Sequence, residues 1–206
     1  MRFILFVEGP TEKALPAFLK RWLDPRLPQP IGITPVPFKG WSHYRDEIAK
    51  KVALNLSGKS GADVVGAIGL LDLYGPDLYP AGKVHAEERR EWAKSFFEGH
   101  VGHPRFRQHF AVHETEAWLL ADPALLPVEV RKVLPGKCSQ PERVNFDEPP
   151  AKLLERLYRE KLSRKYKKTV DGRDLLSRLQ PETAYEKCPS LKLLLDDMLA
   201  LATVRG

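Results

Sequence analysis

The chain has 206 residues, with 33 lysines and arginines against 27 acidic residues and a formal net charge of +6. Hydrophobic residues make up 43% and charged residues 29%, which excludes a disordered chain, and no apolar run approaches the roughly 20 residues that a membrane span needs. The basic excess permits a polyanionic partner but does not require one.

The first predicted element is a strand over residues 2–7. Its apolar run from Phe3 to Val7 is typical of a buried strand at the centre of a sheet. The run is too short for a signal peptide and ends in an acid, Glu8, before a Gly-Pro turn. A helix is then expected from Thr11 to about Trp22, with Thr11 as its N-cap. Open α/β sheets place functional groups at the carboxyl ends of their strands, so Glu8 is a candidate site residue; its alternative role is to cap the helix.

Further strands and helices alternate along the chain. Prolines in the segment 31–38 predict an edge strand, and Ser42 is expected to cap a helix over 44–56. The turn 58–61 contains the letters of a phosphate loop but lacks its upstream glycine and preceding strand. We therefore expect only a turn there. The next predicted elements are an apolar strand over 64–73, a charged helix over 85–99 and a strand over 106–112.

The C-terminal third has a different character. A helix after His113 would bury Trp118 and a neighbouring leucine, and residues 123–148 contain four prolines that indicate irregular structure. Basic helices are expected over 149–163, 171–179 and 188–202. The pattern predicts an α/β fold, with a mostly parallel sheet of about four strands flanked by helices. We assign residues 1–140 to this domain and 141–206 to a basic helical extension packed on it. Two cysteines without metal-ligand spacing favour a reduced, cytoplasmic protein.

Acidic residues fall at the ends of three predicted strands. Glu8 follows the first strand, Asp72 ends the strand over 64–73, and Glu114 and Glu116 follow the strand over 106–112. Since parallel strands lie about 4.8 Å apart, acids at their common edge can converge on Mg²⁺ or Mn²⁺. Asp72 could instead only form a turn, and one of the two glutamates could only compensate a helix dipole. His113 is more often a packed histidine than a ligand.

A basic segment over 156–168 contains seven basic residues and two tyrosines. Such a segment can neutralise phosphates and stack tyrosines on bases, although a solvated helix face is the alternative. The candidate nucleic-acid-binding residues here are Arg164, Lys165, Lys167 and Lys168.

Three short motifs carry a family resemblance. The stretch Val7-Glu-Gly-Pro-Thr-Glu12 resembles the first motif of Toprim domains, and Leu71-Asp-Leu-Tyr74 resembles the second, which normally reads Asp-x-Asp. Together with His113-Glu-Thr-Glu-Ala, in this order, they are similar to a Toprim-related family, the domain of unknown function 4276, which is often encoded near phage-defence genes. The resemblance extends through the basic tail. OLD-type nucleases, topoisomerases and primases also contain Toprim domains.

The resemblance implies a Toprim-like fold and a magnesium-dependent reaction on nucleic-acid backbones. Glu8, Asp72 and Glu116 would hold the metal with Glu114 as an auxiliary ligand, and either Glu12 or a metal-bound hydroxide would accept the proton. Basic residues are implied at Lys152 and Lys168, either of which could stabilise charge on the scissile phosphate. Tyr74 departs from the pattern, because a tyrosine with a pKa of about 10 cannot replace a carboxylate as a hard-metal ligand. The alternative is a non-catalytic partner subunit with a degenerate site, which binds nucleic acid or a neighbouring ATPase.

Overall fold

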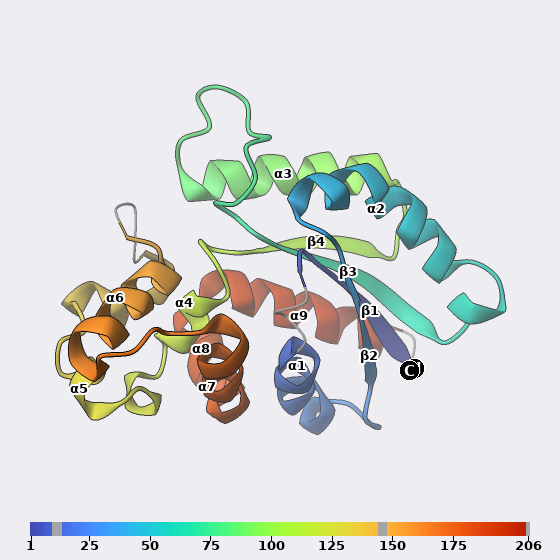
Figure 1. Cartoon of the computed structure of the whole chain (residues 1–206). Coiled ribbons are helices and arrows are strands. Elements are labelled where there is room, and N and C mark those ends of the chain that lie inside the picture. The colour runs from blue at the N-terminus through green and yellow to red at the C-terminus, as the bar shows by residue number, and fades with distance from the viewer. Residues whose placement is uncertain (10–13, 144–147, 205–206) are drawn as a thin grey trace.

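A computed structural model describes residues 1–9, 14–143 and 148–204. Within them the chain forms a four-stranded sheet in the order β2-β1-β3-β4, and every pairing is parallel (Figure 1). The strands are β1 (Arg2–Val7), β2 (Gly32–Pro37), β3 (Val64–Asp72) and β4 (Phe106–Ala111). The carboxyl ends of the two central strands, β1 and β3, therefore lie next to each other.

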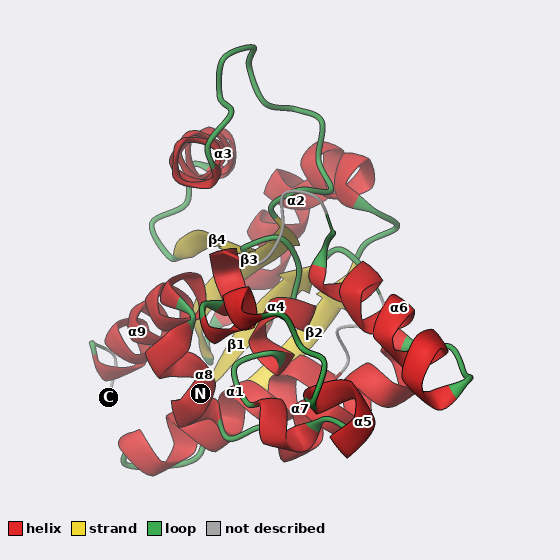
Figure 2. Cartoon of the chain, turned by 90° about the vertical axis from the view of Figure 1, so that its left-hand side faces the viewer, coloured by secondary structure: helices red, strands yellow, loops and turns green. Residues whose placement is uncertain are grey.

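Helices cover both faces of the sheet, as the two perpendicular views show (Figures 1 and 2). One face is covered by α2 (Trp41–Leu56) and α3 (Ala86–Val101), and the other by α1 (Leu15–Leu23) and α9 (Pro189–Thr203). The remaining helices are α4 (Glu116–Leu119), α5 (Val128–Arg131), α6 (Pro150–Leu162), α7 (Arg173–Arg178) and α8 (Pro181–Lys187). A π-helical turn, η7 (Lys168–Gly172), precedes α7.

The two-residue period of β1 divides its side chains between two cores. Phe3, Leu5 and Val7 pack with α1 and α9, whereas Ile4 and Phe6 pack with α2 and α3. All five side chains are at most 1% exposed, so both faces of this strand are buried. A continuous apolar run is the pattern that such a strand requires, and the prediction of a buried central strand is confirmed.

Gly69 of β3 marks a close contact between α2 and β4. The Tyr44 hydroxyl donates a hydrogen bond of 2.6 Å to Gln108 Oε1 in the buried space over this glycine. A Cβ at position 69 would lie 2.0 Å from Tyr44 Oη and 2.4 Å from Gln108 Oε1. The glycine therefore makes room for a polar contact between two elements that are 64 residues apart in sequence.

Most predicted elements are confirmed, with shifts at their ends. The proline-containing strand β2 lies at an edge of the sheet, and α4 buries Trp118 completely. The prediction that Ser42 caps the second helix is wrong, because α2 begins at Trp41 after Gly40, whose φ of 96° suits a glycine. Sequence periodicity also missed α8 and the one-turn helix α5. The expected cap at Thr11 lies outside the described residues.

The C-terminal helices share a core with the sheet. The larger hydrophobic cluster joins Phe3 and Leu5 of β1 to Leu153 of α6 and Leu191 of α9. Residues on either side of position 140 thus contribute to one apolar interior; the assignment of residues 1–140 and 141–206 to a domain and its extension stays a prediction. In the part of the chain that the structure describes, no helix is both long and apolar enough to cross a membrane.

Candidate acidic site at the carboxyl edge of the sheet

Glu8 and Asp72 lie at the carboxyl ends of the two central strands. Asp72 is the last residue of β3, and Glu8 directly follows β1. The backbone of Gly75 borders Glu8, since a Cβ there would lie 3.8 Å from Glu8 Oε2. Burial raises the pKa of the Asp72 carboxyl well above its ordinary value, and the charge of Glu8 is among those that raise it further. The two acids therefore act on each other electrostatically.

Glu114 and Glu116 reach this edge through an unusual backbone turn. His113, just beyond β4, adopts a φ of 59°, the left-handed region that non-glycine residues rarely occupy. The turn leads into α4, which begins at Glu116. Glu116 is only 4% exposed, and burial raises the pKa of its carboxyl, with the charge of Glu114 adding to the effect. Strained backbone of this kind is often found where side chains must be aimed at a site.

Lys168 connects the two glutamates. Its Nζ lies 2.6 Å from Glu114 Oε2 and 3.2 Å from Glu116 Oε2. Burial lowers the pKa of this ammonium, but the carboxylates of Glu116 and Glu114 outweigh burial and raise it above its ordinary value. Lys168 is therefore charged at neutral pH, and it lies at the centre of the acidic group.

Glu114 has a second contact, which supports its alternative role of compensating a helix dipole. Its Oε1 accepts a hydrogen bond of 3.0 Å from the backbone N–H of Ala151, in the first turn of α6. A carboxylate at this position compensates free N–H groups and the positive end of a helix. Glu114 therefore holds α6 against the sheet edge with one oxygen and Lys168 with the other.

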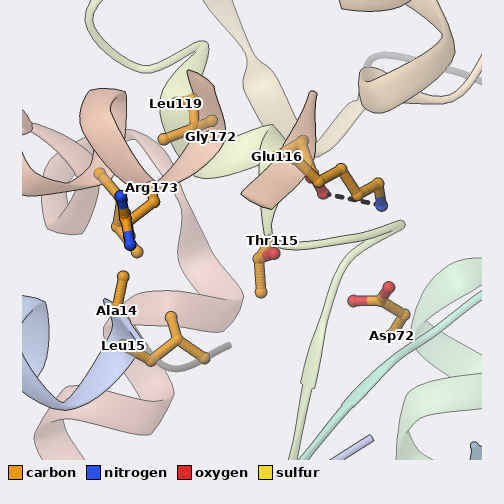
Figure 3. Close-up of a pocket in the computed structure, with 10 residues that line it drawn as sticks. Ala14, Leu15, Asp72, Thr115, Glu116, Leu119, Gly172 and Arg173 are labelled. Carbon is orange, nitrogen blue, oxygen red and sulfur yellow. Dashed lines mark hydrogen bonds and ion pairs between the residues drawn. The ribbon is translucent and has the colours of Figure 1, made fainter. Parts of the chain in front are cut away.

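A cavity of about 40 Å³ opens beside these residues. Figure 3 shows Asp72 and Glu116 on one side of it and Arg173 on the other, with Thr115 between them. The wall is formed by Ala14, Leu15, Asp72, Thr115, Glu116, Leu119, Lys168, Gly172, Arg173 and Leu176. Carboxylates, a hydroxyl and two cations thus meet at one small opening.

The donor chemistry of this group suits a hard divalent cation, which prefers carboxylate oxygens. Burial is the main cause of the raised pKa values of Asp72 and Glu116, and the charges of neighbouring carboxylates add to it. Among residues 1–9, 14–143 and 148–204, however, no group of three or more His, Cys, Asp or Glu side chains has the arrangement of a metal site. The residue types fit magnesium or manganese, while the position between the two glutamates is taken by an ammonium.

The other predicted site residues lie in different settings. Glu12 lies outside the described residues. Lys152 is exposed and pairs with Glu155 at 3.0 Å, and Arg164 pairs with Asp171 at 2.8 Å. Lys165 and Lys167 are exposed. Of the five predicted nucleic-acid-binding residues, the structure brings Lys168 alone into the acidic group.

Three groups near the site had not been predicted. Thr115 and Arg173 line the cavity. The Tyr74 ring packs against the ring of His113, with 4.3 Å between the two ring centroids. Tyr74, which follows Asp72 where a second acid was expected, therefore supports the strained turn. No local sequence pattern could have identified Arg173, because the contact depends on how the C-terminal segment folds back.

Comparison with known protein families identifies the family of this chain. The family model described as a domain of unknown function, DUF4276, matches residues 7–199. The chain belongs to this family. The match spans Glu8, Asp72, Glu114, Glu116 and Lys168, so every described residue of the acidic group lies inside it. No curated protein and no solved structure matches the chain.

Proposed function

We propose that this DUF4276 protein is a metal-dependent, nuclease-like enzyme that hydrolyses phosphodiester bonds of nucleic acid. The observation that supports it is the convergence of Asp72, Glu114 and Glu116 at one edge of a parallel sheet, within electrostatic reach of Glu8. Buried like charges oppose folding, so a group of acids is not expected at this edge for structural reasons alone. The proposal includes the relation to Toprim domains, a cytoplasmic location and a role in phage defence.

In this proposal Glu8, Asp72 and Glu116 hold Mg²⁺ or Mn²⁺, with Glu114 as an auxiliary ligand. A bound ion would supply positive charge for the scissile phosphate and an activated water. Lys168, which lies beside Glu114 and Glu116, would place its ammonium near the ion and could neutralise a phosphate oxygen of the substrate. Glu114 keeps α6 in place through Ala151, and Glu12 is the proposed proton acceptor.

A second candidate is a non-catalytic partner subunit that binds nucleic acid or a neighbouring ATPase. The specific observation in its favour is the close pair between Lys168 and Glu114. An internal ammonium already neutralises part of the acidic group, and Tyr74 stands where a further carboxylate was expected. On this alternative the site is a structural ion-pair network without an ion.

Cleavage assays separate the two candidates. We expect the purified chain to nick plasmid or cut single strands in manganese, and Glu8→Gln or Asp72→Asn to lower the rate at least about 100-fold, because metal-site changes of even the outer shell cost up to that much. Glu129→Gln, at an exposed position on α5, removes the same charge outside the site and should leave cleavage unchanged.

Two results would reject the enzyme. The first is a chain that cuts nothing in magnesium or manganese, alone or with its neighbouring gene product. The second is cleavage that both site variants retain, since the activity would then arise elsewhere.

A further inference from the structure

We propose that Arg173 binds the phosphate next to the scissile one, so that the site selects a polynucleotide over a single phosphodiester; this inference rests on the proposed function. Arg173 is the first residue of α7 and lines the same cavity as Asp72 and Glu116 (Figure 3). The cavity thus has a carboxylate side and a guanidinium side. A chain of phosphates could contact both sides at once.

The size of the cavity limits what can enter it. One water needs roughly 10–15 Å³ of such space, so about 40 Å³ accommodates a few waters or the oxygens of a phosphate group but no nucleobase. A phosphate group, and not a base, is therefore the part of the ligand that would enter this cavity. This matches a substrate class defined by consecutive phosphates, independent of sequence.

The two cations of the cavity, Lys168 and Arg173, differ in whether a carboxylate already pairs with them. Lys168 is held by Glu114 and Glu116, whereas Arg173 has no ion pair with any carboxylate in the described ranges. A polyanion approaching the acidic group needs a cation to offset the repulsion. A guanidinium suits this task, because its planar N–H groups match two phosphate oxygens.

Local packing sets the position of Arg173. The preceding residue, Gly172, has a φ of −62°, which any residue can adopt, so backbone conformation does not explain the glycine. Space does, because a Cβ there would lie 2.7 Å from the buried hydroxyl of Tyr166. The π-helical turn η7 places Lys168 before this contact and Arg173 directly after it. The two cations are therefore carried by one closely packed segment.

A comparison of two substrates tests the inference. Arg173→Gln should lower kcat/KM about 10-fold on a single-stranded oligonucleotide, the effect of removing one phosphate-binding group worth about 1.4 kcal/mol. On bis(4-nitrophenyl) phosphate, which has no neighbouring phosphate, the rate should stay at the wild-type value. The matched control is Arg131→Gln, an exposed arginine of α5 outside the cavity, which should match the wild type on both substrates. Arg173 is exposed, so circular dichroism should show an unchanged fold.

A binding measurement tests Arg173 even if no cleavage occurs. The fluorescence anisotropy of a labelled oligothymidylate, measured in calcium over a range of salt, should show a slope that is smaller by about 0.7 in Arg173→Gln and unchanged in Arg131→Gln. This result without any cleavage by the wild type would remove the proposed enzyme and keep Arg173 as a phosphate-binding residue. Equal slopes in the wild type and Arg173→Gln, or no binding at any salt, would overturn the inference. So would equal losses on both substrates, which would place Arg173 at the scissile phosphate.

Discussion

The described part of the acidic group places several carboxyl groups around one ammonium group, that of Lys168. Burial and the charges of Glu116, Glu114 and Glu8 raise the pKa of Asp72, and only Lys168 among these charges opposes them. Ionised Asp72 therefore opposes folding when no cation is bound. We expect the repulsion within this group to lower the stability of the folded protein, and a bound cation to reduce that repulsion.

Replacing Asp72 with asparagine should stabilise the metal-free protein by about 1 kcal/mol, because the change keeps the size and removes a carboxyl group whose ionisation burial and neighbouring charges oppose. Urea unfolding at neutral pH measures the difference. Added manganese should raise the stability of the wild type but not that of Asp72→Asn, since only an intact site binds the ion in the folded state.

Glu129→Gln on the exposed face of α5 is the control for the loss of one negative charge. It should change neither the free energy of unfolding without metal nor the stabilisation by manganese. A metal response that is the same in Asp72→Asn and in the wild type would show that Asp72 is not a ligand.

His109 provides a pH-dependent contact away from the acidic site. It is 6% exposed on β4, and its Nε2 lies 3.2 Å from Asp197 Oδ2 on α9. Burial lowers the pKa of this imidazole, and the nearby Asp197 carboxylate only partly offsets the effect. Well above pH 6.5, the ordinary pKa of histidine, His109 is neutral in both the folded and the unfolded chain, so its contribution to stability is constant.

As the pH falls below about 6.5, the unfolded chain binds a proton at His109 that the folded chain does not, and stability should decrease. We expect His109→Gln to show a smaller loss between neutral and mildly acidic pH than the wild type. His113 adds to the loss in both proteins, because burial lowers its pKa to about 4. His100→Gln, on the exposed side of α3, should keep the wild-type pH profile, and an unchanged profile in His109→Gln would contradict this account.

At the scale of elements, glycines in β3 decide how closely its neighbours approach. Gly66 faces Phe3 and Leu201 on the side of the sheet that α1 and α9 cover. Gly69 faces Tyr44 and Gln108 on the side that α2 and α3 cover. In the second case the approach buries the Tyr44 hydroxyl, which donates to the Gln108 amide oxygen, while the Gln108 amide nitrogen donates to the backbone carbonyl of His109. The contact links α2 to β4, which are not adjacent in sequence.

Removing one partner of this pair should be costly. Tyr44→Phe leaves Gln108 Oε1 buried without its donor, and such a loss typically costs about 1–3 kcal/mol of folding free energy. Urea unfolding should show this decrease. Tyr185→Phe, which removes a hydrogen bond to Asp196 at a partly exposed position, should cost less. Equal costs would mean that water satisfies Gln108 in the variant.

For the whole molecule, a net charge of +6 is distributed over a surface on which many cations are already paired. Arg164 and Lys168 interact with Asp171 and with the two glutamates, respectively. Within the basic run, Lys165 and Lys167 are the exposed lysines of the turn that leads into η7. They are the better candidates for contacts with a nucleic-acid backbone.

Alanine at both Lys165 and Lys167 should reduce the salt dependence of single-strand binding, by about 0.7 in slope for each phosphate that the protein no longer neutralises. Anisotropy titrations over a range of salt give the slopes. The matched control replaces Lys50 and Lys59, two exposed lysines of α2 and the turn before β3, and should leave the slope unchanged. A slope that the Lys165 and Lys167 variant retains would place the phosphate-binding residues elsewhere.

The amino-acid sequence by itself determined the strands and the edge of the sheet at which the acids lie. Period and composition are local properties: the apolar run of β1, the prolines of β2 and the acid at the end of β3 each lie within a few residues. Because parallel strands end at a common edge, these local patterns were sufficient to place Glu8 and Asp72 together. The same locality explains why α8, a short helix between prolines, was missed.

Only the tertiary structure decided how the acidic group is completed. Whether Glu114, Glu116 or both face the site depends on the left-handed turn at His113, which packs against Tyr74. Lys168 reaches the glutamates from 54 and 52 residues away. Contacts of this separation arise from the packing of the C-terminal helices into the shared core, and no period or motif encodes them. For this reason Arg173 was found in the structure and not in the sequence.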